Sequence, residues 1–129
     1  MLVRFVSGLP FLAILFLLFP TQSWSQGLPE GITWEVVAVY KVDTPGVDRV
    51  ELGKFTMAPG TVLKDFLLEA TEFCTITEGS VSVMNQDLGT TTLYAAGSRW
   101  SQAKGQTVTV TNPGDVPAVQ WVYELYPKE

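Results

Sequence analysis

The side chains in this sequence that are able to do chemistry are mostly carboxylates. The chain has 13 Asp and Glu residues, one cysteine and no histidine. Without imidazole it can form neither a Ser-His-Asp triad nor a Cys-His pair, and it lacks the usual nitrogen ligand of transition metals. Glu72 and Cys74 stand two residues apart in the run EFCTITE, so they would share one face of a strand. Any chemistry therefore centres on Glu72, with Cys74 beside it.

Glu72 also stands between two glycines at a regular spacing. Eleven residues separate Gly60 from Glu72, and six separate Glu72 from Gly79. This spacing resembles the first sequence motif of the cupin family, in which two histidines precede the glutamate. The two histidine positions of that motif fall on Phe66 and Leu68.

A second run resembles the second cupin motif. Seven residues separate Gly97 from Gly105, and six separate Gly105 from Asn112. The histidine position of this motif falls on Val108, and its proline position falls on Ala103. The resemblance covers about residues 50–126 and implies an all-β, cupin-like double-stranded β-helix, that is, a jelly-roll barrel of the small single-domain type.

The substitutions at the histidine positions decide the expected metal chemistry. A cupin site holds a divalent ion with three imidazoles and one carboxylate, and each of these groups offers a lone pair at neutral pH. Phe66, Leu68 and Val108 offer none, and one carboxylate with one thiol is too few donors for useful affinity. A shifted register starting at Gly89 would put Trp100 at the last histidine position and also supplies no ligand. We therefore expect no metal and no other cofactor.

Two interpretations of Glu72 remain open. Enclosed in an apolar interior, its carboxyl would have a raised pKa and would suit general acid or base catalysis near neutral pH. Alternatively, it reaches the barrel mouth and stays hydrated, or it pairs with Arg99 or Lys104. Cys74 is expected to be a core residue, because an acidic neighbour disfavours the reactive thiolate.

The first 25 residues have the pattern of a secretory signal peptide. Arg4 precedes the apolar run FLAILFLLF, Pro20 ends that run, and Ser23 and Ser25 provide small residues before a cleavage point. The run is short for a membrane span, although an uncleaved anchor is the alternative. We predict a signal peptide at 1–25, a single domain at 26–129, and a secreted or periplasmic location.

The charge balance argues against nucleic acid as a partner. The formal net charge is −5, and removing Arg4 with the signal peptide makes it −6. An acidic surface without a basic stripe repels a phosphate backbone. The single cysteine permits no internal disulfide, and the absence of an N-glycosylation sequon leans toward a bacterial periplasm.

Short apolar runs separated by turn residues predict strands rather than helices. The predicted strands are 33–40, 50–57, 62–68, 72–78, 80–84, 90–94, 107–111 and 119–126. Trp34 and Trp121 fall in the first and last of these, which we expect to pair. Period-two alternation then assigns the faces. The expected interior residues are Phe66, Leu68, Glu72, Cys74, Ile76, Val108 and Val110.

Three functions follow from this interior. The first is binding of a small molecule or protein partner without catalysis, with Phe66, Leu68, Glu72, Cys74, Val108 and Val110 as the ligand-binding residues. The second is a metal-independent enzyme of isomerase or lyase type that uses Glu72 as acid or base. The third is a structural or oligomer-forming module with a filled barrel. Leu67 and Phe73 fall on outer faces, where a homodimer could form.

Overall fold

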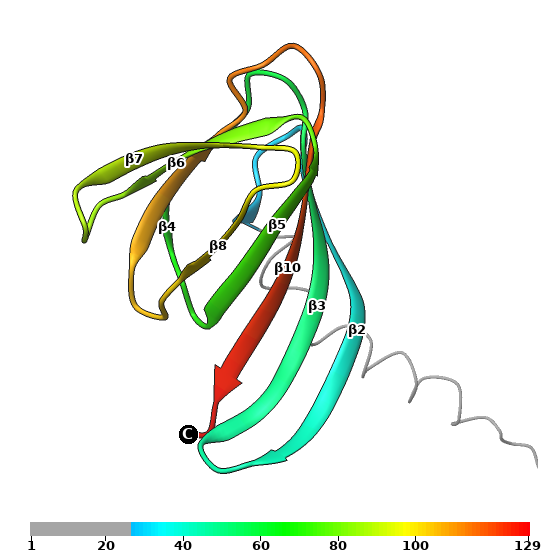
Figure 1. Ribbon diagram of the computed structural model, residues 1–129, viewed down its shortest axis with the longest axis vertical. Helices are drawn as coiled ribbons and strands as arrows, with labels where there is room; N and C mark the ends of the chain where they lie inside the picture. Colours follow the sequence, from blue (N-terminus) through cyan, green and yellow to red (C-terminus); the bar gives the residue numbers. More distant parts are fainter. Residues whose placement is uncertain (1–26) are drawn as a thin grey trace, which may run out of the picture.

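The computed structural model describes residues 27–129 as two packed antiparallel sheets (Figure 1). The strands are β2 (Ile32–Thr44), β3 (Val47–Met57), β4 (Val62–Leu67), β5 (Thr71–Glu78), β6 (Ser80–Asn85), β7 (Thr90–Ala95), β8 (Arg99–Gln102), β9 (Thr107–Thr111) and β10 (Ala118–Pro127). A five-stranded sheet has the order β2-β3-β10-β5-β8, and a four-stranded sheet has the order β4-β9-β6-β7. The all-β jelly-roll expectation is confirmed. The predicted signal peptide lies outside the described residues.

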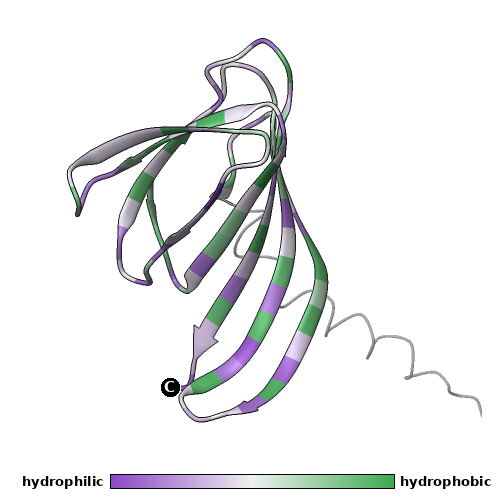
Figure 2. Cartoon of the chain, viewed as in Figure 1, coloured by the Kyte–Doolittle hydropathy of each residue, from purple (hydrophilic) through white to green (hydrophobic). Residues whose placement is uncertain are grey.

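Alternation of apolar and polar side chains explains why these segments form strands around a common core. Bands of opposite hydropathy follow one another along β3 and β10 (Figure 2). In β3 every second residue from Glu51 to Met57 is buried, while the residues between them are partly exposed. The inner faces of the two sheets form one core. It contains Ile32, Phe55, Met57, Leu63, Leu68, Ile76, Val81, Val83, Val108, Val110 and Ala118.

Two expectations about the strands were wrong. No strand was predicted at β8, because four residues with one aromatic and no β-branched side chain carry little strand signal. Its pairing with β5 stabilises it, and Trp100 of β8 stacks on Tyr94 of β7 with ring centroids 3.8 Å apart. The first and last strands also do not pair, because β3 lies between β2 and β10. Trp34 therefore faces Phe55 of β3 in the register, and Trp121 faces Lys54.

The β2–β3–β10 part of the larger sheet extends past the four-stranded sheet at one end (Figure 1). Gly46, with φ 84°, makes the turn between β2 and β3, and its carbonyl accepts a hydrogen bond from the amide of Lys128 at 3.0 Å. The C-terminus is therefore held against the β2–β3 turn. In the part of the chain that is described, no helix has the length and apolarity needed to cross a membrane.

Candidate functional site

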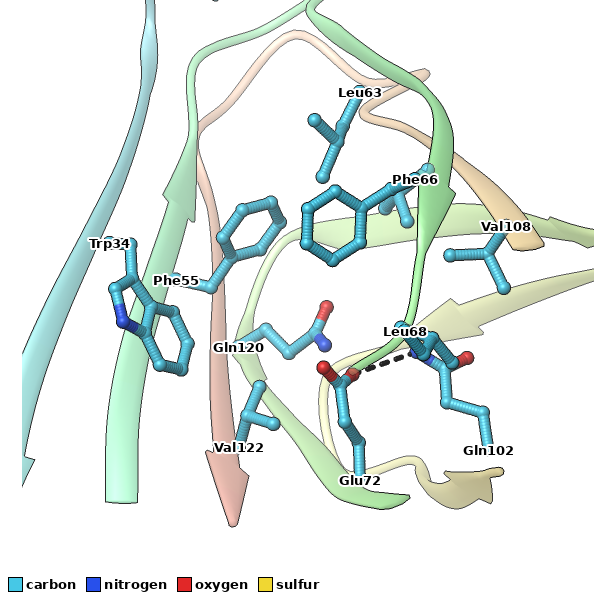
Figure 3. A pocket seen from close by; sticks show the side chains of 11 residues that line it. Trp34, Phe55, Leu63, Phe66, Leu68, Glu72, Gln102, Val108, Gln120 and Val122 are labelled. Carbon is cyan, nitrogen blue, oxygen red and sulfur yellow. Dashed lines mark hydrogen bonds between the residues drawn. The ribbon is translucent and has the colours of Figure 1, made fainter. Parts of the chain in front are cut away.

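Most of the predicted site residues lie around one small cavity between the two sheets, which we call the interior cavity (Figure 3). Its lining residues are Trp34, Phe55, Leu63, Phe66, Leu68, Glu72, Gln102, Val108, Val110, Gln120 and Val122. Cys74 is buried next to this cavity without lining it. Five residues that the sequence placed inside the barrel are thus brought together by the three strands β4, β5 and β9 and by the loop after β4. Ligand binding by these residues remains a prediction.

A bulge in β4 explains how Phe66 reaches the interior. The pairing of β4 with β9 is regular at Leu63 and again at Phe66, with a register shift between them. Asp65 in this bulge has φ 51°, a left-handed conformation that Asp tolerates better than most residues. Its amide donates a hydrogen bond to Thr109 Oγ1 at 3.1 Å. The bulge lets both Leu63 and Phe66 point inward, and it sets Phe66 directly opposite Val108.

The interior cavity is small. The space open to the centre of a water-sized sphere measures about 20 Å³. This volume is enough for about one water molecule. Small-molecule pockets usually measure hundreds of Å³. Phe66, Leu68 and Val108 therefore occupy most of the space that three imidazoles and a metal would fill. The question that the sequence left open, whether the barrel is hollow or filled, is answered in favour of a nearly filled interior.

Glu72 is enclosed rather than hydrated. Only 4% of its surface is exposed, and Gln102 Nε2 donates a hydrogen bond to Glu72 Oε1 at 2.9 Å (Figure 3). The expectation that Glu72 stays hydrated or pairs with Arg99 or Lys104 was therefore wrong. Its cross-strand partner on β8 is the amide Gln102, and β8 was the strand that the sequence did not predict. Burial raises the pKa of Glu72, and hydrogen bonds from Gln102 and from Glu124 partly oppose that rise.

Glu124 is a buried acid that sequence reasoning missed. It lies directly opposite Glu72 in the pairing of β10 with β5, and only 2% of its surface is exposed. Tyr126 Oη donates a hydrogen bond to Glu124 Oε1 at 3.0 Å. Burial and then the neighbouring charge of Glu72 raise the pKa of Glu124 to about 9. The alternation Gln120, Val122, Glu124 along the last strand was the signal that could have placed Glu124 inside.

Cys74 is an inert thiol in this environment. Only 2% of its surface is exposed, and its Sγ lies 3.9 Å from Glu72 Oε1. Burial first, and then the charge of Glu72, raise the pKa of the Cys74 thiol well above its usual value. A thiol without thiolate character is a poor nucleophile and a poor metal ligand.

The donor set does not fit the metal that cupins hold. Across residues 27–129, no group of three or more His, Cys, Asp or Glu side chains is arranged to hold an ion. Apart from Glu72 and the amides of Gln102 and Gln120, the lining side chains are apolar and offer no lone pair that suits such an ion.

Two of the motif residues that match the cupin pattern, Asn112 and Gly79, have structural roles. Asn112 is fully buried, and its Nδ2 donates hydrogen bonds to the carbonyls of Met57 at 3.0 Å and Val116 at 2.9 Å. Its Oδ1 accepts one from the amide of Gly114 at 2.9 Å. Gly79 has φ 69°, and a Cβ there would lie 2.4 Å from the carbonyl oxygen of Pro117. These positions shape turns between strands and touch no candidate ligand site.

A larger hollow lies at the end of the barrel where β5 begins and β10 ends, and we call it the mouth groove. Its volume is about 410 Å³. Its walls are Asp48, Arg49, Glu69, Lys104, Tyr126, Pro127, Lys128 and Glu129. An overlapping hollow of about 400 Å³ also reaches Leu68, which lines the interior cavity as well. Leu68 therefore separates the mouth groove from the interior cavity.

The cationic side of the mouth groove is held in place by an ion-pair cluster. The guanidinium of Arg49 lies 3.9 Å from the ring centroid of Tyr126, a cation–π contact. Arg49 Nε donates to Glu51 Oε2 at 2.6 Å, and Arg49 Nη1 donates to Asp48 Oδ2 at 3.0 Å. Lys104 and Lys128 have no carboxylate within ion-pair distance among the described residues.

Comparison with solved structures identifies the architecture. A cupin superfamily protein from Desulfitobacterium hafniense matches with a TM-score of 0.59 and 11% identity over 77% of this chain and 81% of that chain. The cupin_2 domain of an XRE family transcriptional regulator from Enterobacter cloacae matches with a TM-score of 0.63 and 14% identity, covering 77% of this chain and 100% of that domain.

An oxalate oxidase in complex with glycolate matches with a TM-score of 0.58 and 22% identity over 74% of this chain and 51% of that one. No protein-family model and no curated protein sequence matches the chain. The protein therefore has the cupin jelly-roll fold. Its structural neighbours include an enzyme and a domain of a regulator, so the fold alone does not specify an activity.

Proposed function

We propose that this protein is an exported, metal-free binding protein with a cupin fold, and that it binds a small molecule without catalysing a reaction on it. The observation that carries the proposal is the contrast between the two hollows. The interior cavity has room for about one water, whereas the mouth groove of about 410 Å³ is within the range of ligand sites. The ligand accordingly occupies the mouth groove and is separated from Glu72 by Leu68.

The lining of the mouth groove favours a small organic anion with a flat apolar part. Lys104 and Lys128 are cations without an ion-pair partner in residues 27–129, and Tyr126 provides an aromatic surface next to Pro127. Arg49 is already committed to Glu51 and Asp48, so it orients Tyr126 more than it attracts a ligand. An anion would contact Lys104 and Lys128 and lay its apolar part on Tyr126.

Native mass spectrometry of the exported protein tests this proposal. A co-purified mass of a few hundred daltons is expected, and Lys104→Ala should reduce its occupancy about tenfold, because losing one charge-assisted contact costs about 1.4 kcal/mol. Lys64→Ala is the matched control, since Lys64 is exposed on β4 and away from the groove. Equal occupancy in Lys104→Ala and wild type, or a stoichiometric transition metal in the spectrum, would refute the proposal. Glu72→Gln should leave binding nearly unchanged, whereas an enzyme that uses Glu72 would lose its activity.

A second candidate, an oligomer-forming module, is favoured by the outer face of the larger sheet. Phe73 and Tyr123 are cross-strand neighbours there and are 50% and 47% exposed. Adjacent exposed aromatics are typical of surfaces that bind another protein. Light scattering distinguishes the candidates. A dimer of wild type that Phe73→Ser converts to a monomer would support the module, and a monomeric wild type at micromolar concentration would exclude it.

A further inference from the structure

Three buried glutamates form a continuous row across the larger sheet. Glu51 of β3 lies opposite Glu124 of β10, and Glu124 lies opposite Glu72 of β5. Glu72 in turn lies opposite Gln102 of β8. All four side chains are on the inner face, and none is more than 8% exposed. Cross-strand neighbours have their Cβ atoms about 5 Å apart, so the carboxyl groups are adjacent.

Among the described residues, the three glutamates of the row have one ion-pair partner between them, which is Arg49. Arg49 is the partner of Glu51, with Nε 2.6 Å from Glu51 Oε2. Glu124 and Glu72 have no cation within ion-pair distance in the described part of the chain. Glu72 receives a neutral amide hydrogen bond from Gln102, and Glu124 receives a neutral phenol hydrogen bond from Tyr126. Two adjacent carboxyl groups in such an enclosed place cannot both be ionised at moderate cost.

The side chain of Gln120 gives separate evidence that a small molecule is bound next to this row of glutamates. Gln120 is 5% exposed, and its Oε1 has no hydrogen-bond partner among residues 27–129. Figure 3 shows its side-chain amide beside the Glu72 carboxyl at the interior cavity, which both residues line, with the amide nitrogen nearer to Glu72 and Oε1 turned away from it. An unpartnered buried acceptor costs free energy unless a donor reaches it. The cavity has room for about one water, and a water there would donate to Gln120 Oε1.

We propose that Glu72 and Glu124 form a carboxylic acid–carboxylate pair that holds one proton, with a single buried water beside it at Gln120, and that this assembly is a proton-transfer site. The proton resides on Glu124, because Glu124 is flanked by an acid on both sides, whereas Glu72 is flanked on its other side by the amide donor of Gln102. The high pKa of Glu124, about 9, agrees with this assignment. The proposal does not depend on the identity of any ligand.

The proton has a short route between the interior and the mouth groove. In the ground state Glu124 donates its proton toward Glu72, and transfer gives a Glu124 carboxylate and a Glu72 acid with no change in the net charge of the pair. Tyr126 connects Glu124 to the mouth groove, which its side chain lines. The other titratable groups around the pair are Glu51, Arg49 and Cys74, and the residues facing it from the smaller sheet are apolar.

Carbon-13 NMR of the side-chain carboxyl groups between pH 4 and pH 10 tests the pair. One carboxyl signal should remain that of a protonated acid at pH 7, and Glu124→Gln should remove it. Glu72→Gln should lower the pKa of Glu124, because the neighbouring charge is gone. Glu78→Gln, at an exposed position at the end of β5, is the matched control and should leave that signal unchanged.

Thermal unfolding gives an independent measure. A carboxyl whose pKa is raised in the folded state binds a proton that the unfolded state has lost, so stability is greatest below the unfolded pKa and falls as pH rises toward 9. The melting temperature of wild type should fall by roughly 10 °C between pH 6 and pH 9, and Glu124→Gln should show a much smaller fall. In Glu124→Gln the amide N–H replaces the proton that Glu124 donates.

Three results would overturn the proposal. One is that every glutamate of the wild type titrates below pH 6, which would mean that no proton is shared. Another is that Glu124→Gln and wild type have the same pH dependence of stability. The third concerns the water: a high-resolution crystal structure with an empty interior cavity would remove it from the site. The wild-type titration decides the first question even if a variant fails to fold.

Discussion

Glu72 and Gln102 face each other across β5 and β8, and Gln102 Nε2 donates a 2.9 Å hydrogen bond to Glu72 Oε1. Gln102 Oε1 also accepts a hydrogen bond from Trp100 Nε1 at 3.3 Å. One amide therefore satisfies a buried carboxyl and fixes an indole that stacks between the sheets. The short edge strand β8, whose sequence gives little sign of a strand, supplies Gln102 as this polar partner. The hydrogen bond lowers the free-energy cost of burying Glu72.

Replacing Gln102 should test that role. We expect Gln102→Leu to lower the free energy of unfolding by about 1.5–3 kcal/mol, because a hydrogen bond to a charged group is lost in a buried place. The pKa of Glu72 should rise further, since that hydrogen bond favours its charged form. Urea unfolding and NMR titration measure the two effects. Ser101→Ala, on the outer face of the same strand, should change neither, and an unaltered Glu72 titration in Gln102→Leu would contradict the role.

The thiol of Cys74 should resist alkylation in the folded protein. Burial and the charge of Glu72 raise its pKa, and each unit of that rise removes tenfold of the reactive thiolate. We expect iodoacetamide at pH 8 to label native protein at least about 100-fold more slowly than protein in denaturant. Mass spectrometry follows the reaction. Complete native labelling within minutes would show that Cys74 is accessible and ionised.

Asn112 should prove to be a structural residue. Its side chain makes three hydrogen bonds in a fully buried site, to Met57, Val116 and Gly114. Each hydrogen bond contributes about 1 kcal/mol, so Asn112→Ala should lower the free energy of unfolding by about 3 kcal/mol. Asp115→Ala, exposed in the same turn, is the control. A loss below about 0.5 kcal/mol in urea unfolding would show that these bonds contribute little.

Returning imidazoles to the motif positions should create a metal site. Phe66, Leu68 and Val108 line the interior cavity with Glu72, so Phe66→His/Leu68→His/Val108→His would surround it with three nitrogens and one carboxylate. We expect this variant to bind Ni²⁺ or Co²⁺ and to be stabilised by it, with affinity reduced at least about tenfold by an added Glu72→Gln. Calorimetry and thermal unfolding measure both. Circular dichroism first establishes that the variant is folded.

The absence of metal binding by a folded triple variant would show that the assignment of the second motif to Val108 is wrong. The opposed positions of Phe66 and Val108 in the register already favour that assignment over the shifted one at Trp100, which stacks on Tyr94. Phe66→His/Val108→His is a milder version if three buried imidazoles prevent folding.

Much of the fold follows from local pattern. Alternation along single strands predicted the all-β class, and it put Phe66, Leu68 and Val108 on inner faces and Phe73 on an outer one, where the structure has them. It worked because a strand next to a core must bury every second residue. It did not reveal β8, because four residues do not show a period, and it did not show which strands are neighbours.

By itself, the sequence determined what this interior lacks. With no histidine anywhere and apolar residues at three motif positions, the nitrogen ligands of a cupin metal site are missing whatever the packing. Only the tertiary structure decided what replaced them. Glu51, Glu72 and Glu124 are far apart in the chain, and the strand order β3-β10-β5 makes them neighbours. Adjacency across a sheet depends on which strands pair, and packing sets the volume left between them; neither is a local property of the chain.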